Sequence, residues 1–167
     1  MIDLSKTSKQ YKVRLLKESD MDQILNIYKE NELFFRYCNA KPTEEQVLED
    51  MYLTPPNTDP AAKYYVGFYS ENELTAIMDL VDGYPNPEIA YIGLFMMRLA
   101  DQGKQIGSAI IHETEEYLKY AGIKAVRLAI NKGNPQSTHF WKKNGYSVIR
   151  EVNKEGWGIL LEAEKVL

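Results

Sequence analysis

The sequence has little of the chemistry that marks disulfide-rich, metal-binding or membrane proteins. Its 167 residues include one cysteine, Cys38, so neither an internal disulfide nor a cysteine-based metal cluster can form, which agrees with a reducing compartment. No apolar run approaches the roughly 20 residues that a membrane span requires, and the first ten residues carry Lys6 and Lys9 but no hydrophobic signal core. We therefore expect a cytoplasmic protein with no membrane partner.

Long basic segments are also missing from the sequence. The chain balances 20 Lys and Arg against 24 Asp and Glu, for a net charge of -4. Binding to a phosphate backbone needs concentrated positive charge, so we expect no nucleic-acid partner. The two histidines, His112 and His139, lack the clustered partner residues that a metal site needs, and we expect no bound metal.

What is present fits one α/β domain over residues 1–167, because 44% hydrophobic residues can enclose a single core. Apolar patterns predict strands at 11–16, 63–70, 74–81, 88–97, 125–130, 146–152 and from 157 to the end. Helices are predicted after Ser19, after Thr43, at 106–121 and after Asn134. The order strand, helix, strand from 88 to 130 predicts a parallel pair of strands.

Local signals place the beginnings of three helices. Ser19 is expected to cap the first helix, and Thr43 with Gln46 forms a capping-box pattern before the second. Asn134 followed by Pro135 is typical of an N-cap and the first helical position.

The most informative segment, residues 102–108 (QGKQIGS), follows a buried strand and opens a helix. A glycine-containing turn there lets backbone N–H groups point outward together, and the helix N-terminus adds partial positive charge, so a pyrophosphate can bind. The alternative is an ordinary loop whose glycines only satisfy backbone geometry. The sequence contains neither the GxxxxGKS/T pattern of ATP sites nor the GxGxxG pattern of NAD sites.

Together with NPQSTHFWKKNGY at 134–146, this loop resembles the GNAT acetyltransferase superfamily, over residues 11–165. The resemblance implies an α/β fold with a mixed, mostly antiparallel central sheet, splayed parallel strands and about four flanking helices. It also implies acetyl-CoA as co-substrate. The acetyl group would pass directly to a primary amine of a small molecule or peptide, on a monomer or homodimer.

The family's motifs cover three stretches of this chain. A loop of the form R/Q-x-x-G-x-G/A binds the pyrophosphate, and Gln105 replaces its middle glycine here. The preceding strand pairs its backbone with pantetheine, although methionines there are equally typical of core filler. Asn134 either only caps its helix or also bonds to pantetheine. The residues so assigned to acetyl-CoA are Phe95, Met96, Met97, Gln102, Gly103, Lys104, Gln105, Ile106, Gly107, Ser108, Asn134, Ser137, Phe140 and Trp141.

Two of these residues carry sharper expectations. Gly107 is expected to lie so close to the pyrophosphate that Gly107→Asp lowers acetyl-CoA affinity about tenfold or more while the protein still folds. Trp141 stands where many relatives have the tyrosine that protonates the departing thiolate. An indole cannot serve as that acid, because its N–H does not titrate in the useful range.

Amine attack on a thioester needs a proton acceptor and a donor that polarises the carbonyl. The Met97 backbone N–H suits the second role. Relatives place a glutamate base at positions that correspond to Ala129 and Tyr91, and neither is a carboxylate here. Tyr91 is therefore the catalytic candidate, as a proton relay, with a core aromatic as its alternative.

The candidates for acceptor binding surround the predicted strand hairpin. They are Asp79, Asp82, Glu88, Tyr37 and Tyr84. The acids either orient an amine, hold a water or act as ordinary turn residues. The two tyrosines, with Phe34 and Phe35, fit either an acceptor pocket or the core.

Two other classes of protein compete with an enzyme. The missing glutamates and tyrosine favour a catalytically weak acyl-CoA-binding module with the same fold. A nucleotide-binding protein would instead bind ATP that acetyl-CoA does not displace.

Overall fold

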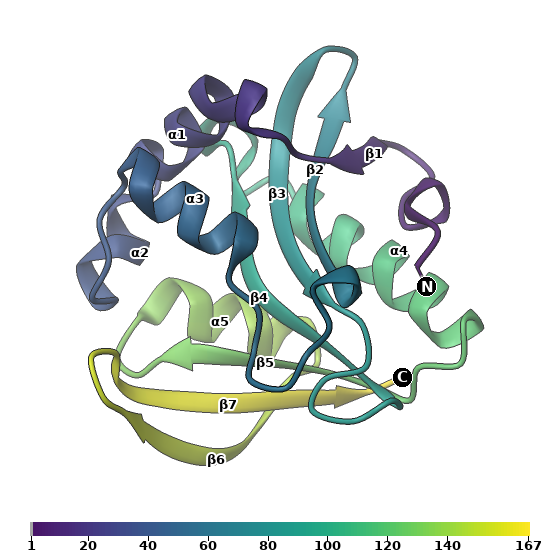
Figure 1. Ribbon diagram of the computed structural model, residues 1–167, viewed down its shortest axis with the longest axis vertical. Coiled ribbons are helices and arrows are strands. Elements are labelled where there is room, and N and C mark those ends of the chain that lie inside the picture. The colour runs from purple at the N-terminus through teal and green to yellow at the C-terminus, as the bar shows by residue number, and fades with distance from the viewer. Residues whose placement is uncertain (1) are drawn as a thin grey trace.

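Seven strands join in one mixed sheet in the computed structural model, which describes residues 2–167 (Figure 1). The strands are β1 (Lys12–Leu15), β2 (Lys63–Ser70), β3 (Glu73–Val81), β4 (Ile89–Met97), β5 (Ala125–Asn131), β6 (Ser147–Lys154) and β7 (Gly158–Val166). Their order is β1-β2-β3-β4-β5-β7-β6, and all neighbours are antiparallel except β4 and β5. The predicted fold class and the predicted parallel pair are confirmed.

Helices cover both faces of this sheet (Figure 1). They are α1 (Met21–Glu30), α2 (Glu32–Tyr37), α3 (Glu44–Tyr52), α4 (Ile106–Tyr120) and α5 (Pro135–Lys143). One buried cluster joins α1 and α3 to the sheet, and a second joins α4 and α5 to its other face. The sequence did not predict α2, a six-residue helix. Within residues 2–167, each helix is too short or too polar to cross a bilayer.

The start of α1 differs from the prediction. Residues Glu18–Asp20 form a 3-10 turn ahead of the helix, so Ser19 is not its cap. The Asp20 carboxylate accepts the Lys17 backbone N–H at 2.9 Å and pairs with Arg14 at 2.8 Å. These charge-assisted bonds are stronger than a serine hydroxyl offers, so they fix the turn instead.

The other two predicted caps are present, one of them in part. Asn134 accepts the backbone N–H groups of Gln136 and Ser137 at 3.1 and 3.2 Å. Thr43 accepts the Gln46 N–H at 3.3 Å. The predicted reciprocal bond of a capping box is wrong, because the Gln46 side chain donates to a carboxylate one turn further along α3.

Strand β4 is paired with β5 only along its first half. The ladder runs from Ile89 and Ala125 to Ile92 and Leu128, whereas β4 continues to Met97. The two strands therefore diverge in the middle of the sheet, and the N–H and C=O groups on that edge of β4 have no strand partner.

A β-bulge marks the point of divergence. Leu80 of β3 pairs with Ile92, and Asp79 pairs with Leu94, so Gly93 is an extra residue in β4. A bulge bends its strand and increases the local twist, which turns the second half of β4 away from β5.

Helix α4 begins directly after a residue with a left-handed backbone. Gln105 has φ 64°, in the region that glycine favours. A side chain in this region costs about 1–2 kcal/mol per residue. Gln105, which replaces the glycine of the GNAT loop, therefore keeps the glycine conformation at a cost in stability.

We predict that Gln105→Gly raises the free energy of unfolding by up to about 1 kcal/mol, because relief of strain exceeds the greater chain entropy of unfolded glycine. For a chain of this size the melting temperature should rise by about 2–4 °C. Gln105→Ala, which removes the side chain but keeps the strain, is the control and should show no rise. If Gln105→Gly is no more stable than wild type, the claim that Gln105 is strained is contradicted.

Candidate functional site

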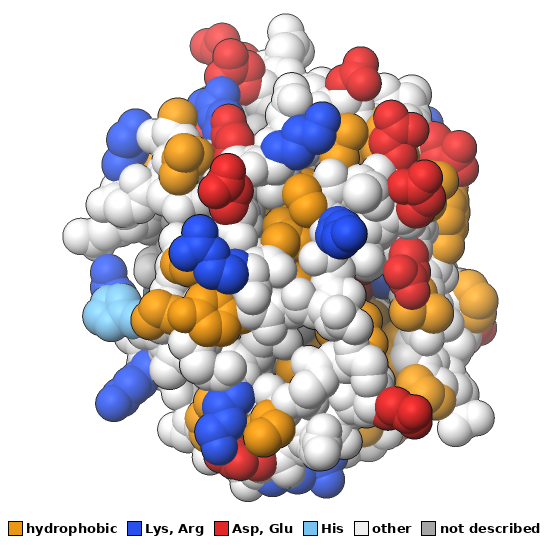
Figure 2. All heavy atoms as spheres, turned by 90° about the vertical axis from the view of Figure 1, so that its left-hand side faces the viewer, with side chains coloured by type: hydrophobic (Ala, Val, Ile, Leu, Met, Phe, Trp, Pro, Cys, Tyr) orange, Lys and Arg blue, Asp and Glu red, His pale blue; other side chains and the backbone are white. Residues whose placement is uncertain are grey.

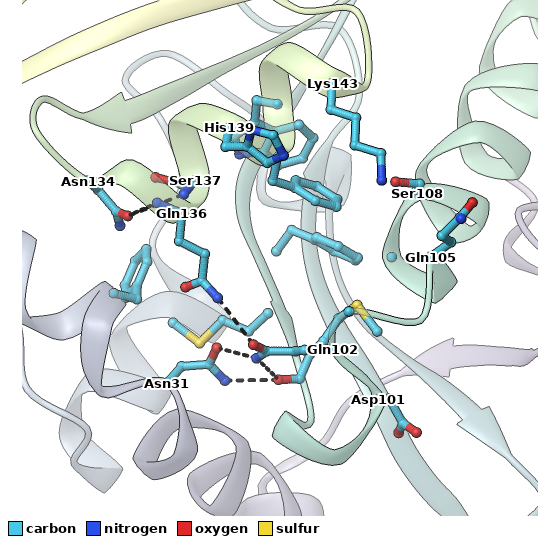
Figure 3. Close-up of a pocket in the computed structure, with 18 residues that line it drawn as sticks. Asn31, Asp101, Gln102, Gln105, Ser108, Asn134, Gln136, Ser137, His139 and Lys143 are labelled. Carbon is cyan, nitrogen blue, oxygen red and sulfur yellow. Dashed lines mark hydrogen bonds between the residues drawn. The ribbon is translucent and has the colours of Figure 1, made fainter.

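A cavity of about 390 Å³ lies between the second half of β4 and helices α4 and α5 (Figure 3). All residues assigned above to acetyl-CoA line it, except Lys104 and Ile106. Lys104 is exposed, and Ile106 packs against the core. The cavity is also lined by Phe34, which the sequence assigned to an acceptor pocket or the core, and by residues that the sequence assigned to no ligand: Asn31, Asp101, Gln136, His139 and Lys143.

The first turn of α4 forms one end of this cavity. Ser108 lies in that turn, and Lys143 of α5 extends toward it (Figure 3). Unpaired N–H groups and the helix dipole make such a terminus attractive to an anion, and the lysine adds a full positive charge. This end of the cavity suits a phosphate or pyrophosphate.

Gly107 also lines the cavity, but neighbouring side chains crowd the position that a Cβ on this residue would take. A Cβ there would lie 2.6 Å from Met97 Sδ and 3.2 Å from a ring carbon of Phe140. Any side chain would have to displace these neighbours. The expectation that Gly107→Asp leaves the fold intact therefore needs correction, because an aspartate there has to push Met97 and Phe140 aside.

The β4 wall presents backbone polar groups to the cavity. The Arg98 N–H donates to the Thr75 carbonyl of β3 at 2.9 Å. Because successive residues of a strand point their backbone groups to opposite sides, the Met97 N–H and C=O point away from β3. Asn31 and Gln102 side chains donate to the Met97 carbonyl at 2.9 and 3.1 Å. The Met97 N–H thus faces the opening, as its predicted role requires.

An amide chain crosses the floor of the cavity (Figure 3). Gln102 Nε2 donates to Asn31 Oδ1 at 3.0 Å, and Gln136 Nε2 donates to Gln102 Oε1 at 3.2 Å. It links the end of α1 to α5. The Gln102 side chain therefore braces the cavity instead of projecting freely from its loop.

Helix α5 supplies the opposite wall. Asn134 is 2% exposed, and its Oδ1 is occupied by the cap, so a ligand bond would use Nδ2. Ser137 Oγ is buried in the cavity wall and has no hydrogen-bond partner among residues 2–167, which fits a ligand amide. Trp141 packs edge-on against Phe140 and Tyr146, each at 5.0 Å between ring centroids. It is a core aromatic.

The candidates for the acceptor side lie outside this cavity. Tyr84 stacks edge-on against Tyr91, with ring centroids 5.4 Å apart. Burial raises the pKa of the Tyr91 phenol, so its hydroxyl stays protonated at neutral pH. Glu88 is exposed just before β4, and Tyr37 lies 3.6 Å from the side-chain position of Gly133, before α5. The predicted aromatic set therefore does not gather in one place.

Asp79 is an acidic candidate whose side chain is largely buried. Lys63 Nζ donates to its Oδ2 at 2.8 Å, and the two side chains are 5% and 13% exposed. Burial raises the pKa of Asp79 to about 6, opposed by Lys63 and reinforced by the nearby Asp50. A carboxylate with a pKa near neutrality is suited to accepting a proton.

Comparisons with known proteins agree with this geometry. An acetyltransferase from Thermus thermophilus superposes with a TM-score of 0.74 at 19% identity, covering 95% of this chain and 97% of that one. PaiA N-acetyltransferase from Thermoplasma acidophilum, solved in complex with coenzyme A, gives 0.65 at 18% identity, covering 93% and 98%. No curated protein matches the sequence. The acetyltransferase (GNAT) family matches residues 21–146. The chain therefore belongs to the GNAT acetyltransferase family.

Proposed function

We propose that this protein is an acetyl-CoA-dependent N-acetyltransferase that transfers the acetyl group directly to a primary amine of a small molecule or peptide. The cavity carries this proposal. It joins an unpaired edge of β4, which suits the amides of pantetheine, to the N-terminus of α4, which suits a pyrophosphate. One elongated ligand that carries both groups would satisfy both ends.

Each wall of the cavity has a part in the proposed reaction. The Met97 N–H would polarise the thioester carbonyl, and Ser137 Oγ would bond to the pantetheine arm. Tyr91 remains the proposed proton relay, with its hydroxyl donating and accepting in turn. The acceptor would approach from the side of the sheet that carries Asp79 and Tyr91.

The class of amine is not specified by overall charge. Figure 2 shows the side of the molecule that carries α2, where basic side chains stand around exposed apolar ones and acidic side chains gather toward the margins. A surface with both signs of charge favours neither a strongly cationic nor a strongly anionic acceptor.

An acyl-CoA-binding module without turnover is the second candidate. It is favoured by Trp141, which is packed in the core and cannot protonate a thiolate, and by the absence of a carboxylate at Ala129 or Tyr91. Both candidates require acetyl-CoA binding, so only turnover separates them.

We predict that the protein releases coenzyme A thiol from acetyl-CoA when an amine acceptor is present. The measurement is steady-state thiol release with spermidine, L-lysine, kanamycin and a tetrapeptide with a free amino terminus, beside a thermal shift with acetyl-CoA alone. Amine-dependent release supports the enzyme. A thermal shift without release supports the binding module. If the protein shows neither a thermal shift nor thiol release, both candidate functions are refuted.

We predict that Ser108→Asp weakens acetyl-CoA binding about tenfold or more. A carboxylate about 4 Å from a phosphate costs about 1 kcal/mol in water and about 4 kcal/mol at an effective dielectric of 20. An aspartate in the first turn of a helix is favourable, so the fold should hold. Calorimetry with acetyl-CoA measures the effect, with the uncharged Ser108→Asn as control. If both variants bind acetyl-CoA as tightly as wild type, the phosphate groups of the ligand do not bind at the first turn of α4.

A further inference from the structure

Gly93 is an exposed residue in an otherwise mostly buried strand. It is the first residue of β4 beyond the last pair with β5, so it lies at the inner end of the opening. Because it has no side chain, the Asp79 side chain can lie directly against its backbone. A Cβ there would lie 2.4 Å from Asp79 Oδ2, so this carboxylate occupies the side-chain position of Gly93, beside the exposed backbone of that residue.

The surroundings of Asp79 leave its carboxylate able to take a proton. Lys63 is the only hydrogen-bond donor to Oδ2 within the described residues, and Oδ1 is buried without a partner there. A carboxylate that accepts two or three N–H groups loses basicity, whereas one that is buried and thinly bonded gains it. Lys63 keeps the group largely ionised without blocking all of its lone pairs.

The groups that face Asp79 from neighbouring elements do not replace it as proton acceptor. They are Lys63 and Tyr65 from β2, Asp50 from α3 and Tyr91 from β4. The Asp50 carboxylate already accepts the Tyr28 hydroxyl at 2.6 Å and the Gln46 amide at 2.9 Å. Burial raises the pKa of both tyrosines, so their phenols stay protonated at neutral pH.

Glu88, another acidic candidate for acceptor binding, is further from the opening. It immediately precedes the strand, where its carbonyl accepts the Lys124 N–H at 2.7 Å beside the paired start of β5. Five residues of strand separate it from Gly93, or about 16 Å. Asp79 therefore has the position that Glu88 lacks.

We propose that Asp79 is the catalytic base of amine acetylation and that Lys63 positions its carboxylate over Gly93. The inference rests on the proposed function. As the neutral amine nitrogen bonds to the thioester carbon, it gives a proton to Asp79 Oδ2. The carbon–sulfur bond then breaks, its electron pair leaves with the sulfur, and the sulfur takes a proton from water while Asp79 returns its own to solvent.

The test compares the pH dependence of kcat/KM for wild type and variants with the best amine of the panel named above. Wild-type activity should fall as pH drops through about 6, where Asp79 becomes protonated. Asp79→Asn should lower kcat about a hundredfold or more with acetyl-CoA affinity unchanged. Asp22→Asn, at an exposed position on α1, is the control and should match wild type.

A second variant separates a catalytic from a structural role. Lys63 lowers the pKa of Asp79, so Lys63→Gln should move the fall of kcat/KM at low pH, the acid limb of the profile, to higher pH. Carboxyl NMR, with Asp79→Asn for assignment, should show the same upward shift in the titration of Asp79 without any turnover. Tyr91→Phe should lower kcat about tenfold and leave the acid limb in place.

The double variant Lys63→Gln with Asp79→Asn guards against misfolding, because it removes both charges of the buried pair together. It should fold, bind acetyl-CoA and be as inactive as Asp79→Asn. A wild-type kcat in a folded Asp79 variant, or an acid limb that Lys63→Gln does not shift, would overturn the assignment of Asp79 as the base. Neither result would contradict the proposed acetyltransferase activity. No turnover by wild type with any amine would refute both.

Discussion

The divergence of β4 from β5 after Ile92 is the constraint on which the rest of the structure depends. Backbone N–H and C=O groups in the middle of a sheet need partners, and the second half of β4 has lost those of β5. Asn31 and Gln102 satisfy the Met97 carbonyl from the side. The groups that still face the opening suit a ligand that carries its own amides, which is why the cavity lies here and not at a sheet edge.

The two ends of the opening have opposite electrostatic character, and each costs stability. The α4 end attracts an anion and contains Gln105 in a left-handed conformation. The inner end holds Asp79, whose pKa of about 6 in the folded protein exceeds the 3.8 of an ordinary aspartate. The folded state therefore binds this proton more tightly than the unfolded chain does, and the contribution of Asp79 to stability falls as pH rises between those values. Such costs are typical of functional sites.

The sequence predicted the parts of the fold that follow from local patterns. Apolar periodicity gave the strands of the sheet and four helices, and Thr43 and Asn134 cap helices as expected. Five residues of the loop at 102–108 line the cavity. The failures arose where tertiary context decides. Ser19 does not cap α1, because the salt-bridged Asp20 fixes the turn before the helix. Met97 and Phe140 pack against Gly107, and no local sequence signal reveals this.

The site's long-range contacts could not be predicted for a similar reason. Gln102 meets Asn31 and Gln136 only because three separate elements converge, and Asp79 faces Gly93 only because of a bulge in the pairing register. Neither contact has a sequence pattern. Asp79 was already a candidate for the acceptor side by its position in the hairpin, but its burial against Lys63 and its closeness to the opening needed the structure.

Amide hydrogen exchange with and without acetyl-CoA tests the central claim most directly. If the opened edge of β4 receives the co-substrate, amides at 93–97 and in the first turn of α4 should exchange more slowly in its presence, while those of β1 and β2 stay unchanged. Unchanged exchange at 93–97, at a concentration of acetyl-CoA that raises the melting temperature, would show that the ligand binds elsewhere and contradict this account.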